Sequence, residues 1–130
     1  MKIKLLLALF VLSCYTVTAQ NEWLTYYELS GEKKTPRYKE TMAYCRKLAE
    51  ASTMVYLSSF GTSPQGRDLP YMVIDKEGLQ DPEAIKASGR LILMVQACIH
   101  PGESEGKDAG LMLVRISPTN LFATGLMSSA

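Results

Sequence analysis

The sequence has almost no excess of charge of either sign, with 14 Lys and Arg residues against 13 Asp and Glu residues in 130. A near-neutral chain has neither the basic surface that attracts nucleic acid nor an acidic tail, so its charge indicates no partner of either kind. The length allows one modest domain and excludes a multidomain protein. The 47% hydrophobic content favours a packed core over a disordered chain.

Long hydrophobic runs are also absent, because the apolar segment Leu5–Val17 is shorter than the roughly 20 residues that span a bilayer. Lys2 and Lys4 precede this segment, and Ala19 provides the small residue that a signal peptidase requires at its cut. This order is typical of a secretory signal. Residues 1–19 are therefore predicted to be a signal peptide, and the protein to be exported to the periplasm or the extracellular space without a stable membrane span.

Two alternatives remain for the N-terminus. Val11–Cys14 looks like a degenerate lipoprotein cleavage box, in which Cys14 would be acylated. A membrane anchor is the other alternative, and the polar residues that follow Ala19 at once argue against it.

Cysteine is scarce, and a cut after Ala19 leaves only Cys45 and Cys98. Export to an oxidising compartment permits a disulfide between them but does not require one. Lone cysteines commonly pack as small apolar groups. Two buried free thiols are therefore favoured over a bridge.

The spacing of apolar residues predicts alternating helices and strands along residues 20–115, the expected domain. The predicted elements are a helix at 36–52, hairpin strands at 54–57 and 69–74 around a loop at 61–66, a short helix at 82–87 with Asp81 as its N-cap, and a helix at 106–115. Leu91–Ile99 is a nearly continuous apolar run, which predicts a strand buried on both faces, as in the centre of an α/β sheet. A functional loop commonly follows such a strand.

The C-terminal segment Ile116–Ala130 contains no charged residue, unlike the chain before it. Pro118 is expected to end the preceding helix, because proline cannot donate a helical hydrogen bond. We expect residues 116–130 to be a divergent tail. It is either a frayed terminal extension or the product of a change of reading frame near Ile116.

One tetrapeptide, His100-Pro101-Gly102-Glu103, follows the apolar run. Proline at the second position and glycine at the third favour a tight type II turn, which brings His100 and Glu103 close together. An imidazole nitrogen and a carboxylate oxygen are suitable zinc ligands. The spacing alone is a weak signal, and an exposed turn with an ordinary His-Glu contact is the alternative.

Several motifs occur together around this tetrapeptide. They are Tyr26-Tyr27-Glu28, Thr35-Pro36-Arg37-Tyr38, Phe60-Gly61-Thr62-Ser63, Gly66-Arg67-Asp68-Leu69-Pro70 and His100-Pro101-Gly102-Glu103-Ser104-Glu105-Gly106-Lys107-Asp108-Ala109-Gly110. In this combination, residues 21–115 resemble the N-terminal part of secreted bacterial zinc carboxypeptidases. The resemblance implies an α/β fold with a mixed sheet flanked by helices, which is incomplete in this chain.

The resemblance further implies that His100 and Glu103 are two of the three protein ligands of a catalytic Zn²⁺ ion. His100 is the only histidine in the sequence, so the family's second histidine ligand is not among these residues, and neither are its glutamate base and substrate-binding arginines. No catalytic residue is therefore assigned. Arg67 has either a functional or a structural role. The implied activity is release of C-terminal residues from peptide or protein substrates.

Two other functions remain open. A zinc amidase or deacylase on the same scaffold also uses an HxxE ligand pair. A catalytically inactive truncated product, or a peptide-binding remnant, is favoured by the single histidine if the 130 residues are the whole protein.

Overall fold

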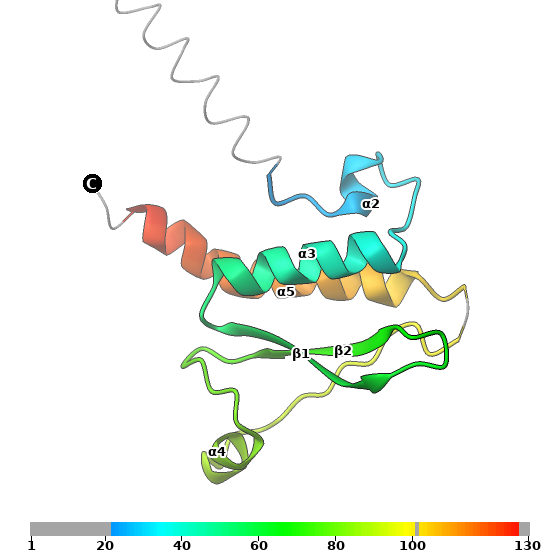
Figure 1. Ribbon diagram of the computed structural model, residues 1–130. Coiled ribbons are helices and arrows are strands. Elements are labelled where there is room, and N and C mark those ends of the chain that lie inside the picture. The colour runs from blue at the N-terminus through cyan, green and yellow to red at the C-terminus, as the bar shows by residue number, and fades with distance from the viewer. Residues whose placement is uncertain (1–21, 101, 128–130) are drawn as a thin grey trace, which may run out of the picture. The chain divides into compact units, whose positions relative to one another are not determined.

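The computed structural model describes residues 22–100 and 102–127, which form helices and one two-stranded antiparallel sheet (Figure 1). The elements in chain order are α2 (Tyr26–Leu29), α3 (Tyr38–Ala51), β1 (Val55–Thr62), β2 (Asp68–Ile74), α4 (Pro82–Ala87) and α5 (Glu105–Met127). The α/β class is confirmed at this level. The chain divides into two compact units, and the boundary along the sequence lies between Thr35 and Pro36.

The predicted signal peptide at 1–19 lies outside the described residues, and so does Cys14. Among the residues that the structure does describe, no helix combines the length and the apolar character needed to cross a membrane.

The first unit contains α2, a helix that the sequence analysis missed. Its start is a capping box in which the Glu28 N–H donates to Thr25 Oγ1 at 3.3 Å and the Thr25 N–H donates to Glu28 Oε2 at 2.7 Å. These two bonds satisfy backbone donors that the first turn of a helix leaves free. The Thr-x-x-Glu spacing was the sequence signal for this helix.

Helix α3 provides the main apolar face of the second unit and confirms the helix predicted at 36–52. Met42, Cys45 and Leu48 are buried and recur every three residues, which places them on one side of the helix. The Arg37 N–H donates to Glu40 Oε2 at 3.1 Å and so satisfies one free donor at the helix start.

The predicted hairpin is also confirmed. Strands β1 and β2 pair in antiparallel register from Val55 opposite Ile74 to Ser59 opposite Pro70, and β1 continues beyond its predicted end to Thr62. Pro70 is tolerated because a two-stranded sheet consists of edge strands only. Val55 is buried, and β1 contacts α3.

The core of the second unit lies around α3, which contacts both β1 and α5. The two helices contact each other and run in the same direction, and Figure 1 shows α4 well away from them. Leu111 of α5 is buried with the apolar residues of α3 and with Val55. The short helix α4 matches its predicted bounds, and Asp81 caps it by accepting the Ala84 N–H at 2.8 Å.

The strand predicted at Leu91–Ile99 is wrong. The segment forms no strand and pairs with neither β1 nor β2, and its side chains are exposed. A strand that is apolar on both faces needs sheet neighbours at its edges and layers on both faces, and the described residues provide only one hairpin. The described sheet is therefore purely antiparallel and not mixed.

The prediction that Pro118 ends the last helix is also wrong, because α5 continues to Met127. A proline inside a helix removes one backbone hydrogen bond and crowds the carbonyl four residues earlier. The helix breaks there only where this cost in free energy exceeds the stabilisation from its other hydrogen bonds and contacts. The first part of the expected tail, 116–127, is thus a continuation of α5.

Candidate metal centre

His100 and Glu103 lie in the loop that joins the apolar segment 91–99 to α5. The Glu103 N–H donates to the His100 carbonyl at 3.3 Å, and Gly102 has a φ of +95°, which glycine adopts at little cost. Both features belong to the tight turn that the sequence predicts. Pro101, the second residue of that turn, lies outside the described residues.

The turn brings the two predicted ligand residues together. His100 Nδ1 lies 3.0 Å from Glu103 Oε1, within hydrogen-bonding and ion-pairing distance. The two side chains are 72% and 60% exposed. The pair therefore faces solvent and is open to a metal ion or to a substrate.

The donor atoms of this pair fit a zinc ion. Zinc bonds to imidazole nitrogen and carboxylate oxygen are about 2.0–2.2 Å long, so two ligands of one ion lie no more than roughly 4 Å apart. The observed separation of 3.0 Å is inside that limit. A metal held by both side chains would replace the direct contact between His100 Nδ1 and Glu103 Oε1.

No third ligand joins the pair within the part of the chain that the structure describes, where no three His, Cys, Asp or Glu side chains gather closely enough to hold a metal. The thiol of Cys98 is close in sequence, but its Sγ donates to the Glu103 carbonyl oxygen at 3.1 Å. This contact helps to hold the turn in shape.

The two described cysteines differ from each other in burial. Both are free, as the sequence analysis favoured, and Cys45 is buried as expected. Cys98 is exposed, so the prediction of a second buried thiol is wrong, because the strand expected to bury it does not form. Burial raises the pKa of the Cys45 thiol, although the charge of Arg46 and a backbone hydrogen bond partly offset this effect.

The C-terminal side of the turn is fixed by the first turn of α5. Lys107 Nζ donates to the carbonyl oxygen of Pro36, just before α3, and also lies 3.7 Å from the buried Asp108 carboxylate. On the other side, a Cβ placed on Gly106 would approach the Cβ of Ala97 to 3.3 Å. The end of the apolar segment thus packs closely against the start of α5, which anchors both ends of the loop.

Arg67, from the motif Gly66-Arg67-Asp68-Leu69-Pro70, has a structural contact. Its guanidinium carbon lies 5.5 Å from the centroid of the Tyr38 ring, a distance at which cations and aromatic faces attract each other. The Tyr38 hydroxyl donates to the Asp68 carbonyl at 3.2 Å. Together these contacts join the tip of the hairpin to the start of α3.

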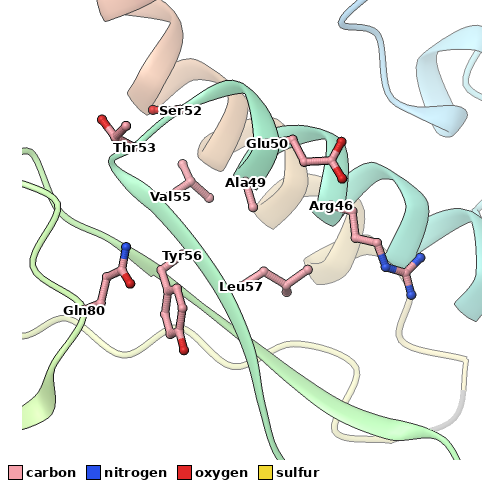
Figure 2. A pocket seen from close by; sticks show the side chains of 9 residues that line it. All are labelled: Arg46, Ala49, Glu50, Ser52, Thr53, Val55, Tyr56, Leu57 and Gln80. Atoms are coloured by element: carbon pink, nitrogen blue, oxygen red, sulfur yellow. The ribbon is translucent and has the colours of Figure 1, made fainter.

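A groove of about 360 Å³ was not predicted from the sequence. Figure 2 shows it between the second half of α3 and β1, with Gln80 at one side. Its lining residues are Arg46, Ala49, Glu50, Ser52, Thr53, Val55, Tyr56, Leu57 and Gln80, and none belongs to the turn that carries His100 and Glu103. The groove is therefore separate from the candidate metal centre.

The geometry thus gives one ligand pair of suitable chemistry, held in a turn between an exposed apolar segment and α5. The local turn predicted that the two side chains lie close together, and the resemblance implied their role as zinc ligands. Ligands from distant parts of a chain leave no such local signal. The chain matches no protein-family model, no curated protein and no solved structure.

Proposed function

We propose that the protein is an exported, zinc-dependent hydrolase of the carboxypeptidase type, in which His100 and Glu103 are two of the metal ligands. The observation that carries the proposal is the 3.0 Å approach of His100 Nδ1 to Glu103 Oε1 in an exposed turn. The resemblance of residues 21–115 to secreted zinc carboxypeptidases supplies the substrate class, a peptide with a free C-terminus.

In this proposal the turn positions the metal ligands. The hydrogen bond from the Glu103 N–H to the His100 carbonyl fixes the spacing of the two side chains. Their exposure leaves room for further ligands and for a peptide beside them. When bound, zinc supplies Lewis acidity, which polarises a carbonyl group and makes water a better nucleophile at neutral pH.

A zinc amidase or deacylase would use the same ligand pair, and only the substrate separates it from a carboxypeptidase. A second candidate function is metal binding without hydrolysis. The described residues bring no third His, Cys, Asp or Glu side chain to the pair, and this favours metal binding without hydrolysis. A site with two protein ligands is expected to bind zinc weakly and exchangeably, with water completing the coordination.

Zinc titration of the full chain tests the proposed ligands. We expect His100→Ala and Glu103→Gln each to weaken zinc binding by more than about tenfold, because each removes one of the ligands. Glu105→Gln is the matched control, since it neutralises a neighbouring exposed glutamate outside the pair and should leave the affinity unchanged. Equal affinities of wild type and His100→Ala would show that the assignment is wrong.

Activity is measured separately, by release of the C-terminal residue from a blocked dipeptide and of an acyl group from an N-acyl amino acid. Zinc-dependent release of the C-terminal residue supports the carboxypeptidase, and preference for the second substrate supports the deacylase. Zinc binding without turnover of either substrate supports the non-catalytic candidate.

A further inference from the structure

The apolar segment 91–99 is an exposed surface that the proposed function does not use. It contains no charged residue, no proline and no glycine. Its large apolar side chains and their exposed fractions are Leu91 100%, Ile92 64%, Leu93 86%, Met94 80%, Val95 64% and Ile99 63%. Exposed apolar residues are normal when they are scattered, but a continuous run of them marks an interaction site.

The backbone of this segment also lacks sheet partners. Residues 91–99 form neither helix nor strand, and Figure 1 shows them as a drawn-out chain between α4 and α5. In the described part of the chain, only β1 and β2 pair with each other. The N–H and C=O groups of the segment are thus free to pair with an added strand, which would also cover its side chains.

The ionisable residues on either side of the segment have partners within the chain. Arg90 lies 2.9 Å from the Asp75 carboxylate and 3.7 Å from that of Glu77. His100 lies 3.0 Å from Glu103. Flanking charges normally keep apolar strands of separate molecules apart by repulsion, and this pairing weakens that protection.

We propose that residues 91–96 pair as a β-strand, parallel and in register, with the same residues of a second copy of the chain. Ala97 is held close to Gly106 at the start of α5, so residues 91–96 are the part that can rearrange. Residues 91–96 are uncharged, lack proline and glycine, and include the β-branched Ile92 and Val95. Short segments of this kind are the ones that stack on identical strands.

A second copy fits this segment better than an unrelated partner. Alternate residues point to opposite faces of a strand, and here both faces are apolar except at Gln96, so an apolar and uncharged partner strand covers the segment best. The same segment of another molecule meets this condition. Gln96 adds to the match, because glutamines stacked in register donate hydrogen bonds to one another.

Sedimentation velocity of the full chain tests the proposal, at concentrations up to about 100 μM and with EDTA present to remove bridging metal. We expect wild type to associate with increasing concentration. Leu93→Lys should weaken association by at least about tenfold, because it places like charges side by side in the paired strands. Since the Leu93 side chain is 86% exposed, the variant should keep the fold of the monomer, which circular dichroism checks.

Phe60→Lys is the matched control, because it removes a side chain of β1 that is 73% exposed and lies outside the segment. It should associate like wild type. A monomeric wild type, or a Leu93→Lys variant that associates as strongly as wild type, would overturn the proposal.

Hydrogen exchange of the associated species locates the contact. We expect the amides of residues 91–96 to become protected on association while those of α3 do not change. Protection confined to β1, or to the second half of α5, would assign the contact elsewhere and overturn the proposal. Because the association is measured with EDTA present, failure of the proposed zinc site would leave this result unaffected.

Discussion

Asp75 directly follows β2, at the end of the hairpin. Its Oδ1 accepts the N–H groups of Glu77 at 2.8 Å and of Leu79 at 3.3 Å, and its Oδ2 lies 2.9 Å from Arg90. Partial desolvation raises the pKa of Asp75, but the two backbone hydrogen bonds and Arg90 outweigh it, so the pKa lies below its ordinary value. The charged form is therefore favoured in the folded state.

This lowered pKa predicts a pH dependence of stability. The stabilisation from Asp75 is fully present above the ordinary carboxyl pKa of about 3.9 and is lost as the pH falls through the lower pKa of the folded state. We expect Asp75→Asn to be less stable than wild type at pH 7 and to lose less stability between about pH 5 and pH 2. Urea denaturation across this range measures both effects.

Asp68→Asn is the control for Asp75→Asn, because it neutralises an exposed carboxylate of β2. Its pH profile should follow that of wild type. An Asp75→Asn variant whose stability falls as steeply as that of wild type in acid would contradict the role of Asp75.

The two described cysteines should react at different rates. Burial raises the pKa of Cys45 and shields its thiol, whereas Cys98 is exposed. With iodoacetamide at pH 7.5 we expect Cys98 to be alkylated at least about tenfold faster than Cys45, as peptide mapping by mass spectrometry measures residue by residue. In urea the two rates should converge. Equal rates without urea would show that Cys45 is not buried.

At the scale of elements, the connections of β1 and β2 depend on two glycines with positive φ. Gly78 has a φ of +73°, and a Cβ at this position would lie 3.0 Å from the Thr53 carbonyl oxygen. Gly66 has a nearly equal φ of +72°, but a Cβ there would meet nothing within 4 Å. The two positions share the backbone conformation and differ in the space around them.

This difference separates backbone strain from crowding. Gly66→Ala should cost about 1 kcal/mol, the typical cost of a left-handed conformation for a residue with a Cβ. Gly78→Ala should cost more, because the turn must also move away from Thr53. Urea denaturation of both variants measures the two costs, and equal losses of stability would contradict the close approach to Thr53.

The elements that the sequence predicted are those set by local signals. α3 follows from apolar residues three apart, α4 from its Asp81 cap, and the hairpin from two short apolar runs around a glycine-rich loop. The segment 91–99 has an equally strong pattern, but a central strand exists only where other strands pair with it. Its failure to form a strand reflects missing neighbours and not a weak local preference.

At the scale of the whole molecule, the described chain buries few large side chains. The buried apolar residues of the described part are Met42, Cys45, Leu48, Val55 and Leu111. They belong to α3, α5 and β1, while the most apolar segment, 91–99, stays outside this core. Small cores give little stability. Burial of segment 91–99 against a second molecule would therefore add to the stability of the chain.

In the candidate metal centre, too, the sequence predicts only what residues close together in the chain determine. A four-residue turn predicted that the side chains of His100 and Glu103 lie close together, and the structure places them 3.0 Å apart. A third ligand or a catalytic base would come from a remote part of a chain, where no spacing rule locates it. The proposed function therefore depends on whether this pair binds zinc.

The most direct test is the ¹H–¹⁵N spectrum of the imidazole ring during addition of zinc to the tag-free chain. His100 is the only histidine, so every imidazole signal belongs to it. We predict that zinc shifts the Nδ1 signal, because this nitrogen faces Glu103 Oε1, and that Glu103→Gln reduces the shift at equal zinc concentration. Imidazole signals that do not move at saturating zinc would contradict the proposed metal centre.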